Sequence, residues 1–255
     1  MIGRVTRRLK KDEAIILNTK RFGEMHKNVQ ILTRNHGLIY ATAFGAAKGK
    51  SRLAGIITPF AEIRLDLYYE PVKGMYKIED GRPVHINEAL HESLPKYYGA
   101  HVIAELLVKS YAGGESSLFF HLTSRTFQVL NSAKAHTVPY VIIQYLWKYL
   151  DAAGFSPDIS CCRECGKSFE NEAAMCYSTG EHGFFCSRCA GAETIKLPRG
   201  GVIYLLHTRK MDLQSALRVE TEGSTVKILI KILTDYIESI LEEPLQSIPM
   251  WLELI

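Results

Sequence analysis

The chain of 255 residues is long enough for one large or two small domains with a well-buried core. Its longest apolar run, residues 141–147, is far too short to span a bilayer, and the basic start of the chain lacks the apolar run of a signal peptide. The net charge of +4 is uneven, because residues 1–52 hold twelve Lys or Arg against three acidic residues, an excess of +9 that leaves −5 for the rest.

Five short apolar and β-rich stretches predict strands in the N-terminal third of the chain. They lie at residues 14–17, 28–33, 38–44, 61–68 and 75–78. Residues 61–68 alternate strictly, which puts Ile63, Leu65 and Leu67 on one face of a strand. Five closely spaced strands within about 70 residues favour a small closed barrel of the OB-fold type. We therefore expect an N-terminal barrel domain at residues 1–82, in which residues 1–11 form a basic extension.

Beyond residue 83 the apolar residues recur every three or four positions, which is typical of helices. The predicted helices cover residues 97–111, 118–130, 137–154, 202–207 and 224–241. Glycines 113 and 114 and Gly154 are expected to end the first and third of these, and Thr137 and Ser224 to cap the third and the last. The expected fold class is α+β, with the barrel followed by an all-helical domain at residues 83–255.

All six cysteines lie between residues 161 and 189, so they are not scattered core thiols. Four of them form two Cys-x2-Cys pairs separated by twenty residues: Cys162, Cys165, Cys186 and Cys189. This spacing is typical of a tetrahedral zinc site, and Gly166 and Gly183 stand where the turns need open backbone angles. The sequence predicts a four-cysteine zinc ribbon inserted at about residues 158–192, with Cys161, Cys176 and His182 as competing ligands.

Two alternatives to a structural zinc are disulfide bonds and a catalytic or redox site. Disulfides lack a secretory context, and four sulfur ligands leave no open position for an activated water. The signatures of zinc deaminases, zinc proteases and serine hydrolases are absent, and the Gly-Lys-Ser at residues 49–51 lacks the first glycine of a phosphate-binding loop, because Phe44 stands at that position. These absences favour a binding protein over an enzyme.

Three cations alternate in a glycine-rich loop after the third predicted strand: Lys48, Lys50 and Arg52. Such side chains neutralise phosphates, and nearby rings offer surfaces on which unpaired bases stack: Tyr40, Phe44, Phe60, Tyr68, Tyr69 and Tyr76. About half of these rings should face the barrel interior, because strand residues alternate in and out. The basic N-terminal part therefore predicts polyanion binding, with a solvated basic face that has no ligand as the alternative.

An ordered series of short motifs runs through nearly the whole chain. It comprises residues 13–17, 22–24, 32–37, 44–46, 50–53 and 58–60, the two cysteine pairs, and residues 245–247. Together these motifs resemble the bacterial RecO family of recombination mediators. The resemblance implies an OB-fold followed by a helical domain that carries a structural zinc ribbon. The lack of a signal peptide and of a membrane-spanning run predicts a cytoplasmic location without a membrane, at the nucleoid.

As its function, the resemblance implies a DNA repair mediator without catalytic activity. Such a protein binds single- and double-stranded DNA, anneals complementary strands, works with RecR, and engages the acidic C-terminal tail of single-strand-binding protein, which helps RecA load. The DNA contacts would be the loop and barrel cations: Lys20, Arg21, Arg34, Lys48, Lys50 and Arg52. Ala47 and Gly49 depart from the usual basic residue and proline of the family. The alternative is an adaptor whose helices, around residues 98–154, bind an acidic peptide while DNA contact is incidental.

Overall fold

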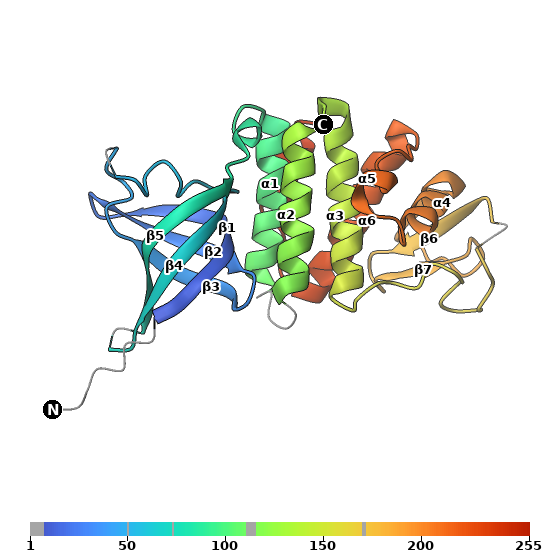
Figure 1. Ribbon diagram of the computed structural model, residues 1–255. Coiled ribbons are helices and arrows are strands. Elements are labelled where there is room, and N and C mark those ends of the chain that lie inside the picture. The colour runs from blue at the N-terminus through green and yellow to red at the C-terminus, as the bar shows by residue number, and fades with distance from the viewer. Residues whose placement is uncertain (1–7, 50, 73, 111–115, 170–171) are drawn as a thin grey trace. The chain divides into compact units, whose positions relative to one another are not determined.

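A computed structural model divides the chain into two units, Met1–Ser132 and Ala133–Ile255. It describes residues 8–49, 51–72, 74–110, 116–169 and 172–255 (Figure 1). Among these residues no helix combines the length and the apolar character that crossing a membrane requires.

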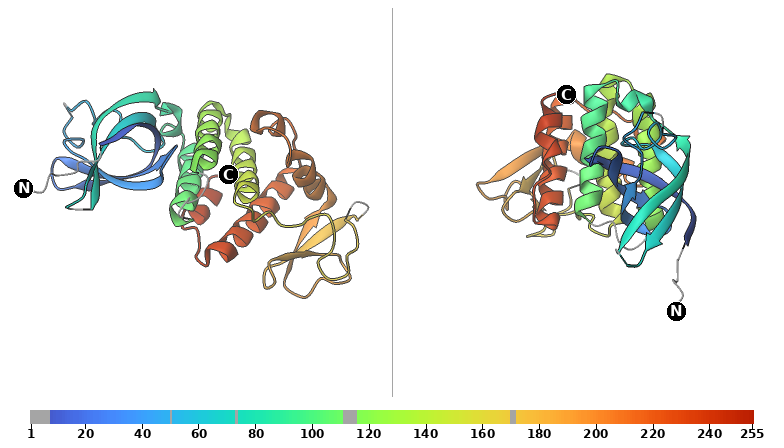
Figure 2. Two further views of the ribbon diagram at one scale, coloured as in Figure 1. Left: turned by 60° about the horizontal axis from the view of Figure 1, so that its bottom comes forward. Right: turned by 90° about the vertical axis from the view of Figure 1, so that its left-hand side faces the viewer.

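The first unit begins with a closed barrel of five strands, as the sequence predicts. The strands are β1 (Arg8–Phe22), β2 (His26–Thr33), β3 (Gly37–Ala43), β4 (Glu62–Glu70) and β5 (Met75–His85). Their order around the barrel is β1-β2-β3-β5-β4, and β4 pairs back onto β1 to close it (Figures 1 and 2). Neighbouring strands are antiparallel except for the β3–β5 pair, which is parallel.

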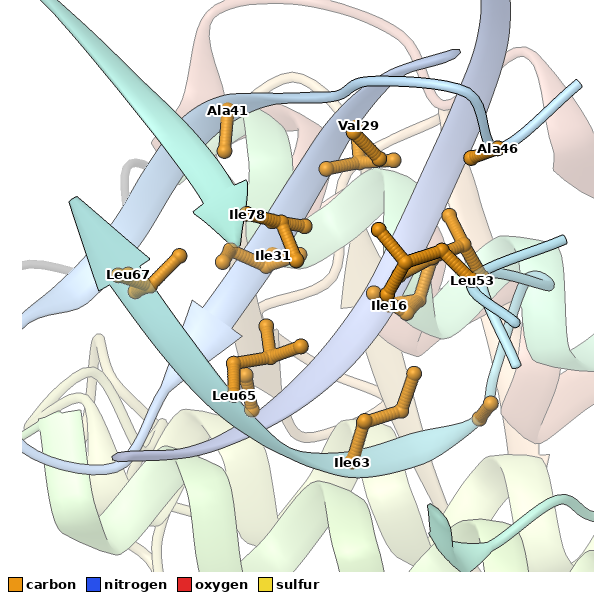
Figure 3. Close-up of a cluster of buried hydrophobic side chains, with 14 of the residues drawn as sticks. Ile16, Val29, Ile31, Ala41, Ala46, Leu53, Ile63, Leu65, Leu67 and Ile78 are labelled. Carbon is orange, nitrogen blue, oxygen red and sulfur yellow. The ribbon is translucent and has the colours of Figure 1, made fainter. Parts of the chain in front are cut away.

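The barrel interior is filled by the inward side chains of the alternating strands (Figure 3). Ile63, Leu65 and Leu67 of β4, predicted to share a face, are all fully buried in it. Gly81 of β5 fits here because a Cβ on it would lie 3.0 Å from Leu65 Cδ2. A bulge between Ile16 and Asn18 interrupts the register of β1 with β2. Residues that follow this bulge therefore change the face to which they point.

β1 is much longer than the apolar stretch that predicts it. It begins at Arg8, and Arg8 and Leu9 pair with Tyr68 and Leu67 of β4. Residues 8–11 of the expected basic extension thus belong to the barrel, whereas residues 1–7 lie outside the described residues.

Two helices complete the first unit: α1 (Leu94–Lys109) and α2 (Ser116–Ser132), preceded by a single 3-10 turn, η1 (Glu88–Leu90). They pack against the barrel through Phe60, whose buried ring contacts Tyr97 and His101 of α1 and Phe127 of α2. The sequence assigns both helices to the helical domain, whereas the two-unit division keeps them with the barrel. Gly113 and Gly114, expected to end α1, lie outside the described residues.

The second unit is helical with one small sheet. Its elements are η2 (Ala135–Thr137), α3 (Val138–Ala152), β6 (Ala174–Ser178), β7 (Gly183–Phe185), β8 (Thr194–Pro198), α4 (Arg199–Thr208), α5 (Leu213–Ala216), α6 (Gly223–Leu241) and α7 (Ser247–Leu252). The antiparallel sheet has the order β7-β6-β8 and reaches Pro198, somewhat beyond the expected end of the zinc ribbon. The helices share a core in which the Trp147 indole donates to the Leu205 carbonyl at 3.2 Å.

Helix ends follow the sequence signals only in part. Gly154 ends α3 with φ 77°, a left-handed angle that favours glycine. Thr137 precedes α3, but its side chain makes no capping hydrogen bond. Ser224 does not cap the long final helix, because α6 already begins at Gly223 and the capping position belongs to Glu222.

Candidate metal centre and candidate nucleic-acid interface

The four cysteines of the two Cys-x2-Cys pairs lie together in the second unit. Their sulfur atoms are all within 4.8 Å of one another, and the Cys165 and Cys186 sulfurs are 3.8 Å apart. A tetrahedral zinc ion with Zn–S bonds of about 2.3 Å places its sulfurs roughly 3.8 Å apart. The four thiols therefore fit a metal ion of this kind, with Cys162 and Cys186 buried and Cys165 exposed.

Each cysteine pair sits in a tight turn that its own backbone closes. Gly166 N–H donates to the Cys162 carbonyl at 2.9 Å, and Gly166 has a left-handed φ of 68°. Cys189 N–H donates to the Cys186 carbonyl at 3.0 Å. Gly183 is needed for another reason than the one predicted, since its φ is not positive. A Cβ there would lie 2.9 Å from Arg163 Nη1, so this glycine makes room for the Arg163 side chain.

The cluster favours ionised sulfur at one position and a retained proton at another. Backbone N–H groups of Cys189 and Arg188 lower the pKa of Cys186 to about 6. Hydrogen bonds to the sulfurs of Cys165 and Cys186 raise the pKa of Cys189 to about 12. A bound cation would displace that proton, because thiolates are the form that coordinates zinc.

The three competing ligands lie outside the cluster formed by the described residues. Burial raises the pKa of the Cys176 thiol, which disfavours its thiolate. The Cys161 thiol donates to Asp158 at 3.8 Å. The His182 ring contacts Asp235 at 3.1 Å and Tyr177 at 3.3 Å, which ties it to α6.

A second candidate site is the end of the barrel where the β1–β2 turn meets the loop after β3. Ala47 N–H donates to the Met25 carbonyl at 3.0 Å, and Gly45 N–H donates to His26 Nδ1 at 3.0 Å. These bonds hold the loop against the turn. We call this region the basic end. Four of the cations that the sequence predicts for DNA binding lie here among the described residues, namely Lys20, Arg21, Lys48 and Arg52, while Lys50 lies outside the described residues.

The cations of the basic end differ in how free they are. Lys20 and Lys48 are exposed and have no acidic partner in the described part of the chain. Arg21 donates one N–H to the Glu24 carbonyl at 3.2 Å. Arg52 lies 3.6 Å from Asp80, and both side chains are largely exposed, so this ion pair is weak.

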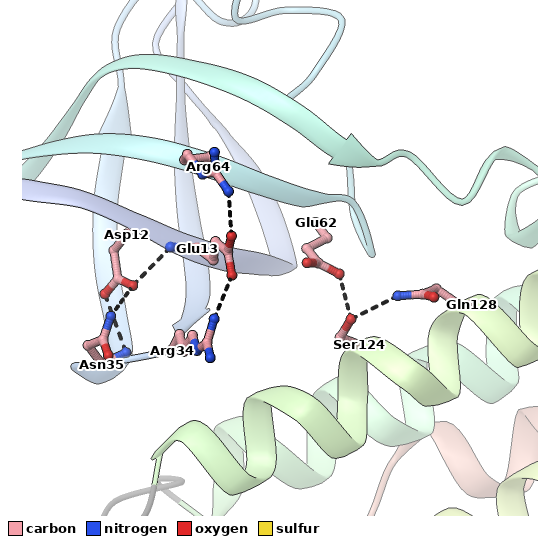
Figure 4. Close-up of polar contacts among 8 residues, drawn as sticks. All are labelled: Asp12, Glu13, Arg34, Asn35, Glu62, Arg64, Ser124 and Gln128. Atoms are coloured by element: carbon pink, nitrogen blue, oxygen red, sulfur yellow. Dashed lines mark hydrogen bonds and ion pairs between the residues drawn. The ribbon is translucent and has the colours of Figure 1, made fainter.

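Arg34 does not belong to the basic end. It lies in the turn after β2, at the opposite end of that strand, where Glu13 accepts from Arg34 at 3.1 Å and from Arg64 at 2.7 Å (Figure 4). The Arg64 guanidinium, more than that of Arg34, holds the pKa of Glu13 below its ordinary value. Arg34 thus already has a carboxylate partner. The same part of the barrel meets α2, where Ser124 donates to Glu62 at 2.5 Å (Figure 4).

Several residues at the basic end are missed by the sequence reasoning. Phe22 is 51% exposed, His26 packs edge-on against Phe44 with ring centroids 4.8 Å apart, and the Lys77 amine lies 5.5 Å from the Phe44 ring centroid. Lys27 is different, because its amine donates to the Ile57 carbonyl at 2.8 Å and burial lowers its pKa. Lys27 thus fixes the loop. Phe22 pairs with His26 across the hairpin, and this neighbourhood depends on the strand register, which the sequence does not reveal.

Of the six rings named from the sequence, two are largely exposed: Tyr40 at 55% and Phe44 at 43%. Phe60 is fully buried against α1 and α2 and is unavailable for stacking. Tyr69 and Tyr76 are half-buried and pack on each other with centroids 4.9 Å apart.

Comparison with known proteins agrees with the layout of barrel, helices and cysteines. The chain matches two family models, "Recombination protein O N terminal" over residues 8–87 and "Recombination protein O C terminal" over residues 91–249. It is 30% identical over 235 residues to "DNA repair protein RecO" of Oceanobacillus iheyensis, covering 89% of this chain and 87% of that protein. It is 27% identical over 246 residues to the protein of the same name from Caldanaerobacter subterraneus, covering 94% and 96%.

Proposed function

Because the chain belongs to the RecO family of bacterial DNA repair proteins, we propose that it binds DNA at the basic end of its barrel. The observation that carries this proposal is that the hairpin end with Lys20 and Arg21 lies against the loop that holds Lys48 and Arg52, beside exposed rings. Cations spaced along a loop and a turn suit a phosphate backbone, and exposed rings suit unpaired bases.

The proposed mechanism is binding without a covalent step. Contacts to phosphates carry no sequence information, so both single- and double-stranded DNA are expected ligands. Neutralising two strands at once lowers their repulsion and lets complementary bases meet, which is annealing. The family's proposed partners are RecR, the acidic tail of single-strand-binding protein and, indirectly, RecA. The four sulfurs would hold a structural zinc ion, whose role is to keep the β6–β8 sheet folded.

The test of DNA binding is a fluorescence-anisotropy titration with a labelled single-stranded oligonucleotide and with the matching duplex in dilute buffer. Lys48→Glu with Lys50→Glu should weaken both complexes by at least about tenfold, since two phosphate contacts become repulsions. The matched control is Lys210→Glu with Lys231→Glu, two exposed lysines of the second unit. Equal affinities of wild type and the loop variant for DNA would rule out the basic end as the DNA-binding site.

A second candidate function, acidic-peptide binding, is favoured by a hollow of 380 Å³ between α3 and α6. The Tyr140 ring and Val226 line it together with Lys227 and Glu220. The ring and the Lys227 cation suit the aromatic end and the acidic groups of a peptide. Lys227→Glu should release a labelled acidic, Phe-ended peptide while leaving oligonucleotide binding unchanged. Peptide affinity that does not respond to Lys227→Glu would exclude this hollow.

A further inference from the structure

The outer surface of β1, β2 and β3 next to the basic end carries side-chain amides where a barrel exterior usually carries charges. Cross-strand pairing sets them in rows on one face. One row runs from Asn18 through Gln30 to Tyr40, and the next runs from Lys20 through Asn28 to Thr42. We call Asn18, Asn28, Gln30, Tyr40 and Thr42 the amide face.

The amide face is bounded by exposed rings on both sides. Tyr40 ends the first row, and the row beyond Asn28 holds Phe22 opposite His26, with Phe44 packed on His26. Strand geometry puts neighbouring rows about 7 Å apart, so the Tyr40 and Phe44 rows are about 13 Å apart. The row of Asn28 and Thr42 therefore lies between two rows that carry rings, and Lys20 is the cation of that middle row.

The amides keep hydrogen-bonding capacity that the protein does not use. Asn18 and Gln30 bond to each other at 3.0 Å, and Thr42 donates to Asn28 at 3.0 Å. Whichever way the Asn18 and Gln30 amides are turned, their single mutual bond leaves a free donor and a free acceptor. The Asn28 amide nitrogen makes no bond to any described residue. An unused donor beside an unused acceptor matches the edge of a nucleobase.

A hollow of 440 Å³ lies over this face. Its lining includes all five residues of the amide face together with Met75 and Tyr76 of β5. A volume of this size is within the range of small-ligand sites, which run from about 300 to 1,000 Å³. The space is thus adequate for one planar base.

We infer that the amide face is a subsite for one unpaired nucleobase of single-stranded DNA, stacked on Tyr40 and held at its edge by Asn28 and Gln30. The inference rests on the proposed DNA-binding function and adds a contact that depends on bases, whereas the basic end contacts phosphates. A phosphate is a poorer occupant, because the described residues that line the hollow offer neutral amides and a single cation, Lys20. Duplex DNA is also a poorer occupant, since its base edges are paired and its rings are stacked.

The experiment compares wild-type binding of a short oligothymidine with binding of an abasic phosphodiester of the same length in the same dilute buffer. Stacking and edge contacts to one base predict about tenfold weaker binding of the abasic strand. Tyr40→Ala should abolish that difference, and Tyr40→Phe should keep it, because the ring and not the hydroxyl stacks. Phe155→Ala, which removes an exposed ring of the second unit, is the matched control and should behave as wild type.

The outcomes separate this inference from the function on which it rests. Equal wild-type binding of both strands would overturn the base subsite and leave phosphate binding intact. A base-dependent difference that survives in Tyr40→Ala would also overturn it, because the base would then bind elsewhere. Failure of wild type to bind either strand would overturn DNA binding at the basic end and the subsite with it.

Discussion

Salt dependence offers the sharpest prediction for the basic end, because the number of phosphate contacts can be worked from the structure. Four described cations of this end are assigned to phosphates: Lys20, Arg21, Lys48 and Arg52. Lys27 is held by the Ile57 carbonyl and Lys77 is paired with Glu70, so neither is counted. Each contact to a single strand contributes about −0.7 to the slope of log affinity against log salt, so four contacts give a slope of about −2.8. Between about 50 and 200 mM salt this slope corresponds to an affinity loss of about 50-fold.

The perturbation is Lys20→Gln with Lys48→Gln. Both lysines are exposed and lack an acidic partner among the described residues, so their removal leaves no buried charge behind. The slope should fall to about −1.4, and the loss over the same salt range should be about sevenfold. Cations outside the described residues add equally to wild type and variant, so the difference between the two slopes is the quantity to measure.

The assay is an anisotropy titration of a labelled single-stranded oligonucleotide at several salt concentrations. Lys210→Gln with Lys231→Gln provides the same change of net charge on the second unit and should retain the wild-type slope. A Lys20/Lys48 variant with the wild-type slope would refute the assignment of these lysines to phosphate contacts, whatever its affinity at a single salt concentration.

A strong chelator should release the proposed zinc ion, measured by mass spectrometry, and speed hydrogen exchange in β6, β7 and β8, while exchange in the barrel strands stays slow. Glu13→Gln should lower the free energy of unfolding at neutral pH by less than about 1 kcal/mol, since both arginine partners are largely exposed. Because folding lowers the Glu13 pKa from 4.5, this stabilisation is present above pH 4.5 and disappears as the pH falls through the lowered pKa; a difference that persists in strong acid would contradict it. Tyr177→Phe removes the hydroxyl that donates to Asp235 and should lower the free energy of unfolding, measured with urea, by about 1–2 kcal/mol. An unchanged free energy of unfolding would show that this hydrogen bond does not stabilise the fold.

The elements that sequence predicts well are those whose signal is local. Period-two alternation is enough for β4, and the two Cys-x2-Cys spacings are enough for the sulfur cluster. The start of β1 has no such signal, because it is polar and includes Asp12. That carboxylate is buried since it accepts hydrogen bonds from Asn35 and His36 in the β2–β3 turn, partners more than twenty residues away.

The strands around the cysteines are missed for a related reason. β6 and β7 are short and buried at every position, so they show no alternation. Site residues fail in the same way when their partners are distant in sequence. In the sequence, Arg34 and Lys48 are equally plausible as DNA contacts. In the fold, Arg34 pairs with Glu13, whereas Lys48 has no acidic partner among the described residues.

The contacts proposed at the basic end and at the amide face predict that single-strand affinity has two separable parts. Phosphate contacts weaken as salt rises, because each releases condensed counterions. Stacking on Tyr40 releases none, so the Tyr40→Ala defect should have nearly the same fold-size at every salt concentration, whereas the defect of a lysine variant should shrink as salt rises. Complementary strands need their base edges free to pair. Binding mainly through phosphates, with one base bound by the protein, is therefore compatible with annealing. A face that held many bases by their edges would oppose it.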